Sequence, residues 1–143
     1  MADPYFALLP PKSLDKNYFS LAWLATHLQQ VLDSPQNIQA TLIYFTAQTI
    51  ANSIQSLPNM AVVVCGGGAH NDYLLQILQK FLPNNKVCGS QAQRINPDFI
   101  EAMMCAWLAY QTMEHIPLHL MSITGASEPA ILGVIYPTHR KKS

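Results

Sequence analysis

The sequence predicts an α/β domain with a small, mainly parallel sheet flanked by several helices. Residues 60–65 (MAVVVC) are apolar throughout and rich in β-branched side chains, a pattern typical of a parallel strand covered on both faces. Three glycines follow at once, then a helical pattern, and then a short strand pattern over residues 86–88. This order is that of a β-loop-α-β unit, in which the two strands run parallel.

Two helices are predicted before the first strand, after an extended, proline-containing segment over residues 1–16. Residues 18–32 can form a short helix. Ser34 then supplies an N-cap and Pro35 stands at the first helical position, which is a strong start signal. The helix that follows carries an apolar stripe and is ended by Pro58; the stripe consists of Ile43, Ala47, Ile50, Ile54 and Leu57.

Two further helices are predicted after the glycines. The first ends at Pro83 and has one apolar face, formed by Leu74, Ile77, Leu78, Phe81 and Leu82. The second opens at Asn96-Pro97, and its methionine and tryptophan side chains are predicted to lie in the core; its apolar face is Ile100, Met103, Met104, Trp107 and Leu108. A loop is expected over residues 122–125, while residues 130–136 fit a strand or a helix. We find no repeat or linker, so residues 1–143 are predicted to form a single domain.

The composition narrows the classes of partner. Charged residues make up 11% of the chain, against about 25% in ordinary soluble domains, which suggests that a partner or further chain covers part of the exterior. The formal net charge is zero, so neither nucleic acid nor an anionic membrane is favoured. No apolar run approaches the ~18 residues of a membrane span, no signal sequence is visible, and the three cysteines show no metal-ligand spacing. We expect a cytoplasmic protein with no metal site of its own.

The glycine loop, residues 66–71 (GGGAHN), is the main candidate binding feature. Gly66, Gly67 and Gly68 permit positive φ and let a ligand approach the backbone. The helix start behind them favours phosphate, and Asn71 can cap that helix or donate to a ligand. The alternative is a tight turn without a ligand. Neither a P-loop nor a dinucleotide fingerprint fits, since no Lys-Ser or Lys-Thr follows and Asn71 replaces a required glycine.

Glu101 is the second candidate, because on a helix it shares a face with Met104, Cys105 and Leu108. A carboxylate on an apolar face must be paired or must contact a polar ligand. The alternative is a partly exposed position in the first turns, favoured by the helix dipole. The pattern leaves both open. We identify no catalytic residue, and His70 is expected to be an exposed turn residue.

Ordered sequence blocks resemble those of the anhydro-N-acetylmuramic acid kinases. The resemblance covers nearly the whole chain without large gaps, and the blocks together are highly specific. They are residues 3–6 (DPYF), 10–13 (PPKS), 21–24 (LAWL), 39–42 (QATL), 65–71 (CGGGAHN), 101–102 (EA), 106–109 (AWLA), 124–127 (TGAS) and 132–137 (LGVIYP).

The resemblance implies the C-terminal nucleotide-binding lobe of a kinase in the actin/sugar-kinase/Hsp70-like superfamily, a partial actin-like (ribonuclease H-like) lobe. Such kinases use ATP and Mg²⁺ to cleave the 1,6-anhydro ring of anhydro-N-acetylmuramic acid and phosphorylate its 6-oxygen during peptidoglycan recycling. By resemblance, Gly66, Gly67, Gly68 and Asn71 face the nucleotide and Glu101 hydrogen-bonds the sugar.

Three departures from the family pattern matter. The family's N-terminal phosphate loop and catalytic aspartate have no counterpart in this sequence, Ser13 is followed by Leu-Asp-Lys instead of Thr-Gly-Arg, and residues 94–98 replace a glycine-containing loop. We therefore expect little activity from this chain alone, and as partner a separate N-terminal lobe or a second copy. The alternatives are a truncated non-catalytic nucleotide-binding or protein-interaction module and, less favoured, a generic Hsp70-like ATPase fragment.

Overall fold

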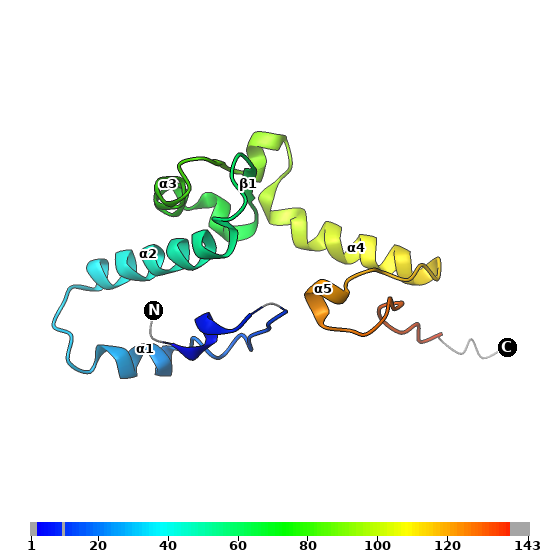
Figure 1. Ribbon diagram of the computed structural model, residues 1–143, viewed down its shortest axis with the longest axis horizontal. Coiled ribbons are helices and arrows are strands. Elements are labelled where there is room, and N and C mark those ends of the chain that lie inside the picture. Colours follow the sequence, from blue (N-terminus) through cyan, green and yellow to red (C-terminus); the bar gives the residue numbers. More distant parts are fainter. Residues whose placement is uncertain (1–2, 10, 138–143) are drawn as a thin grey trace, which may run out of the picture. The chain divides into compact units, whose positions relative to one another are not determined.

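The computed structural model describes residues 3–9 and 11–137 (Figure 1). These residues form two compact units. Unit 1 holds residues 13–100, and unit 2 combines the described residues before 13 with residues 101–137. Within the described part of the chain, no helix has the length and apolar character needed to cross a membrane.

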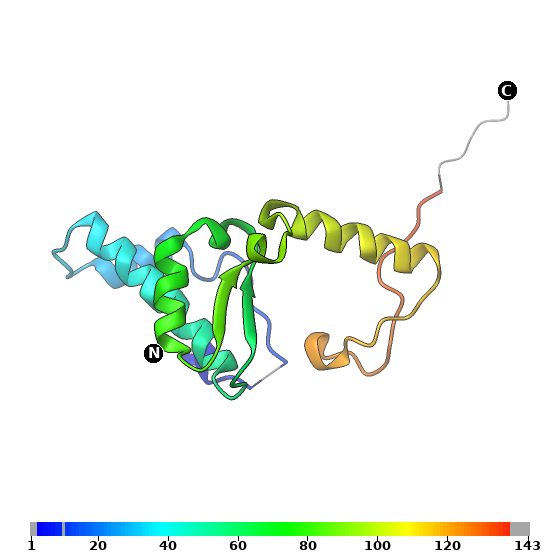
Figure 2. The same ribbon diagram turned by 90° about the horizontal axis from the view of Figure 1, so that it is seen from above.

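Unit 1 is a mixed α/β structure. Its elements in chain order are α1 (Leu21–Leu28), α2 (Pro35–Ile54), β1 (Ala61–Val64), the 3₁₀ turn η2 (Gly66–His70), α3 (Asp72–Phe81), β2 (Lys86–Gly89), and the 3₁₀ turns η3 (Ser90–Gln93) and η4 (Pro97–Phe99). The two strands lie side by side and run parallel, with Ala61 opposite Lys86 and Val64 opposite Gly89 (Figure 2). The predicted β-loop-α-β unit and small parallel sheet are confirmed.

Side-chain caps decide where the first two helices begin. The Ser20 hydroxyl accepts from the N–H of Trp23 at 3.2 Å, so α1 starts at Leu21, three residues later than predicted, and it ends early at Leu28. The Ser34 hydroxyl accepts from the N–H of Asn37 at 3.2 Å, and α2 starts at Pro35 as predicted. Each cap satisfies an N–H group that the first helical turn leaves without an internal partner.

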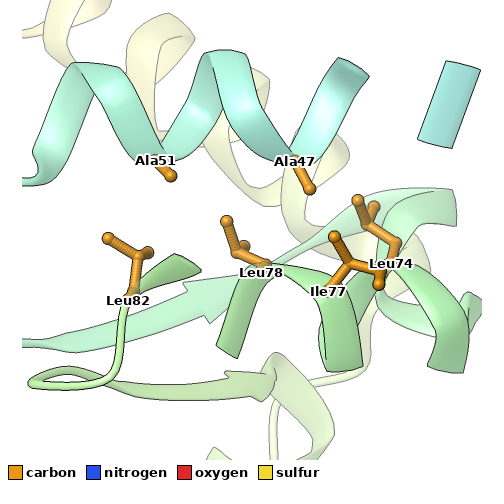
Figure 3. Packing of buried hydrophobic residues seen from close by; sticks show 6 residues of the cluster. All are labelled: Ala47, Ala51, Leu74, Ile77, Leu78 and Leu82. Carbon is orange, nitrogen blue, oxygen red and sulfur yellow. The ribbon is translucent and has the colours of Figure 1, made fainter. Parts of the chain in front are cut away.

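The core of unit 1 lies between α2 and α3. Figure 3 shows the small side chains of Ala47 and Ala51 facing the leucine-rich side of α3, where Leu78 is 0% exposed. Small residues on α2 let α3 approach closely. The predicted stripes on both helices are confirmed, except that Leu57 lies beyond the end of α2 and is 53% exposed.

Gln79 of α3 holds the start of β2 in place. Its side-chain Nε2 donates to the carbonyl oxygen of Asn85 at 2.8 Å, and its Oε1 accepts from the N–H of Val87 at 3.0 Å. Asn85 in turn donates to the carbonyl oxygen of Leu57 at 2.7 Å. These bonds fix the path of the chain from α3 into β2, so they help to set the register of the sheet.

One face of the sheet is covered by the helices of unit 1. Val62 and Val87 pack against the core between α2 and α3, whereas Val63, on the other face, is 38% exposed. The prediction that β1 is covered on both faces is therefore wrong for the described residues. An apolar strand pattern shows that burial is favourable on both faces of the strand. It does not show that the chain contains a further element to cover the second face.

Unit 2 contains the 3₁₀ turn η1 (Pro4–Ala7), α5 (Met121–Thr124) and α4 (Ile100–Met113), whose first residue still belongs to unit 1. The helical chain does begin at Asn96-Pro97, as η4. In place of the predicted loop there is α5, which ends at Thr124 and is capped by Gly125 with φ +74°. Residues 130–136 form neither a strand nor a helix; Ala130 makes one antiparallel bridge to Leu118.

The apolar side chains of α4 are exposed. Met103, Met104 and Trp107 are 56%, 53% and 51% exposed, and α4 has no buried residue. The prediction that these side chains belong to the core is therefore wrong. Helical spacing identifies which residues share a face, but burial requires another element packed against that face.

Candidate functional site

The three glycines of the glycine loop have different structural roles. Gly66 directly follows Cys65 and has φ +63°, a left-handed conformation that glycine adopts without strain. A Cβ on Gly68 would lie 3.4 Å from Cγ1 of Val64, so Gly68 lets the loop pack closely on β1. A Cβ on Gly67 would meet no atom within 4 Å, and its φ is not in the left-handed region. Gly67 leaves the backbone open to an approaching group.

Asn71 caps α3. Its side-chain oxygen accepts from the N–H of Leu74 at 3.0 Å, and its carbonyl oxygen accepts from the N–H of Leu75 at 3.1 Å. With the oxygen used as a cap, the amide NH₂ of Asn71 is the group with which it can donate to a ligand. Asp72, exposed in the first turn, already places a negative charge at this helix end. The loop therefore suits a ligand through its open backbone more than through the helix dipole.

Two side chains from beyond β2 contact the glycine loop. Gln91 Nε2 donates to the carbonyl oxygen of Ala69 at 3.3 Å, and an Asp98 oxygen lies 2.8 Å from Nε2 of His70. His70 and Asp98 are 54% and 59% exposed. The predicted exposure of His70 is confirmed, but neither partner was found from the sequence, because no local pattern links residues 22 and 28 positions apart.

Glu101 is exposed in the first turn of α4. Its predicted neighbours Met104 and Cys105 are exposed as well, and Leu108 is half-buried. Of the two alternatives, the structure therefore shows the exposed, dipole-favoured position. The three loop glycines and Asn71 all lie in unit 1, whereas Glu101 is the first residue of the C-terminal part of unit 2.

Within residues 3–9 and 11–137, no three His, Cys, Asp or Glu side chains are grouped so that they could hold an ion. Mg²⁺ commonly binds through substrate phosphates, water and one or two carboxylates. Mg²⁺ bound in this way needs no group of three protein ligands.

Replacing Gly66 by alanine is expected to lower the free energy of unfolding by about 1–2 kcal/mol, because alanine is strained at a positive φ. Gly67→Ala is the matched control and is expected to change stability by less than about 0.5 kcal/mol, since its Cβ points into open space. Urea denaturation followed by circular dichroism measures both. Equal losses in the two variants would contradict the loop conformation.

Comparison with known proteins matches the chain to one family. A family model described as anhydro-N-acetylmuramic acid kinase matches residues 1–138. Anhydro-N-acetylmuramic acid kinases of Legionella pneumophila (strain Corby), Xylella fastidiosa (strain Temecula1) and Pseudomonas syringae pv. tomato are 49%, 43% and 39% identical to it. The alignments cover 96%, 94% and 96% of this chain, but only 38%, 36% and 38% of the relatives. The chain thus spans somewhat more than a third of their length.

Proposed function

Because the chain belongs to the anhydro-N-acetylmuramic acid kinase family, we propose that residues 1–143 act as the C-terminal, nucleotide-binding lobe of such a kinase. The complete kinase uses ATP to open the 1,6-anhydro ring of anhydro-N-acetylmuramic acid and to phosphorylate its 6-oxygen, in the cytoplasm, during peptidoglycan recycling. The small parallel sheet with its flanking helices is consistent with part of an actin-like lobe.

The conformation of the glycine loop carries this proposal. Gly66 and Gly67 leave backbone without side chains at the carboxyl end of β1, which is where nucleotides bind in open α/β sheets. Gly68 keeps the loop close to the strand, and the NH₂ group of Asn71 adds a donor beside it. In the proposed role these four residues bind the ATP, and its phosphates bring Mg²⁺.

Glu101 is proposed to bind the sugar. As an exposed carboxylate in the first turn of α4, it is already stabilised by the helix dipole and has two oxygens that can accept hydrogen bonds from sugar hydroxyls. It acts as a binding residue and not as the base that activates the attacking water, since the family's catalytic aspartate has no counterpart in this sequence.

Catalysis is proposed to need a further lobe. Phosphoryl transfer depends on groups that surround the phosphates and the nucleophile together, and the residues described here supply one loop and one carboxylate. The curated relatives are longer than this chain, which covers 38% of the first of them. We propose that a separate N-terminal lobe supplies the rest.

ATP binding to the glycine loop is tested by calorimetry on the 143-residue chain with Mg²⁺. Gly67→Val is expected to weaken ATP binding by on the order of tenfold or more, equivalent to at least about 1.4 kcal/mol, because the side chain fills the open approach. Ala61→Val adds methyl groups at the other end of β1 and should leave the affinity unchanged. Equal affinity of wild type and Gly67→Val would refute the loop as the site, and no ATP binding by the wild type would refute the proposal for this chain.

A non-catalytic interaction module is the second candidate. It is favoured by the exposed apolar side chains of α4, since contiguous exposed apolar surface marks interaction sites. A fusion of residues 1–143 to the N-terminal part of the Legionella relative discriminates the two. Sugar phosphorylation by the fusion supports the kinase lobe, whereas a folded, ATP-binding fusion without turnover supports the module.

A further inference from the structure

The segment that joins β2 to α4 contacts two successive residues of the glycine loop, Ala69 and His70. This connecting segment, residues 89–99, contains η3 and η4. Gln91 reaches the carbonyl oxygen of Ala69, and Asp98 pairs with the His70 ring. The loop is thereby held at its C-terminal end, beside Asn71, while Gly66 and Gly67 stay open.

Both ends of the connecting segment are packed into unit 1. Ser90 is 1% exposed, and Pro97 is buried. Between them the chain turns through Arg94, which has φ +61°, and the N–H of Ile95 donates back to the carbonyl oxygen of Ser90 at 3.2 Å. Gln91 and Asp98 therefore reach the loop from positions that are themselves fixed.

Gly89 makes room for the Gln91 contact. A Cβ on Gly89 would lie 2.7 Å from Nε2 of Gln91, far inside van der Waals distance. The Gln91 side chain thus folds back over the end of β2 to reach Ala69. A methyl group at residue 89 would push the flexible end of this side chain away from the loop.

We propose that Gln91 and Asp98 are positioning residues for the nucleotide loop, and that the connecting segment makes the loop and the 3₁₀ turn η4 move as one body. The proposal rests on the proposed function, in which the loop binds ATP.

Residue-resolved amide hydrogen exchange of the 143-residue chain tests the mechanical link. Asp98→Ala, Gln91→Ala and Gly89→Ala are expected to raise exchange of the amides of residues 68–71 by about threefold to tenfold, the equivalent of one net hydrogen bond. Amides of the α2 and α3 core should not change. Conversely, His70→Ala should raise exchange at residues 98–100. Unchanged exchange, or a uniform rise throughout unit 1, overturns the link.

ATP affinity tests the positioning role. Gln91→Ala, Gly89→Ala and Asp98→Ala are each expected to weaken ATP binding by about threefold to tenfold, and Asp98→Asn, which keeps an acceptor for the His70 ring, should restore most of the loss. Gln76→Ala, on the exposed side of α3, and Glu114→Ala are controls expected to have no effect.

Failure of the proposed function and failure of the positioning role give different experimental results. Wild-type chain that binds no ATP refutes the proposed function, and the exchange measurements then still decide whether the connecting segment holds the loop. Wild-type chain that binds ATP, with equal affinity in the three alanine variants, overturns the positioning role even if their exchange changes. If Asp98→Asn binds ATP as weakly as Asp98→Ala, the contact between residue 98 and the His70 ring does not position the loop.

Discussion

Leu78→Ala is expected to lower the free energy of unfolding by about 2–5 kcal/mol. Leu78 is 0% exposed and lies at the centre of the α2–α3 core, opposite Ala47 and Ala51. The alanines on α2 are too small to fill the space that a truncated Leu78 leaves, so a cavity adds to the lost transfer free energy. For a domain with a total stability of about 5–15 kcal/mol, this loss is a large fraction.

Leu21→Ala is the control for the core variant, since Leu21 is 84% exposed and leucine and alanine have similar helix propensity. Its expected effect is within about 0.5 kcal/mol. Urea midpoints measured by circular dichroism compare the two variants. A comparable loss from both would mean that the α2–α3 contact is not the main source of stability in unit 1.

Glu101→Ala is expected to lower kcat/KM for the anhydro sugar by roughly 10- to 150-fold in the Legionella fusion. This range corresponds to the loss of one hydrogen bond to a charged group, about 1.5–3 kcal/mol. ATP affinity should not change, because the glycine loop is intact. The measurement is coupled-assay kinetics with sugar as the varied substrate and ATP saturating.

Glu101→Gln is the matched variant, because it keeps the shape and one acceptor oxygen but removes the charge. Its kcat/KM is expected to lie between those of wild type and Glu101→Ala. Glu114→Ala, another exposed carboxylate near the far end of α4, should behave like wild type. If Glu101→Ala and Glu114→Ala have the same kcat/KM, Glu101 does not bind the sugar.

Local structure in this protein follows closely from local sequence. Ser34-Pro35 starts α2 where the pattern predicts, and the apolar run of β1, the glycine turn and the stripe of α3 are all in place. The reason is physical: caps, positive-φ positions and 3.6-residue periodicity act over a few residues, so they are readable from neighbouring letters. The ordered blocks likewise identified the family, which the comparisons confirmed.

Burial and long-range pairing were decided only by the tertiary structure. The apolar spacing of α4 predicts a core helix, yet Trp107 is half exposed, because spacing cannot supply the element that would cover it. The sequence pattern allows two environments for Glu101, and the structure shows the exposed one. The contacts of Gln91 and Asp98 with the glycine loop, and the close approach of the Gln91 side chain to Gly89, depend on how the chain returns from β2. That path is set by packing between distant residues, for which a single sequence carries no local signal.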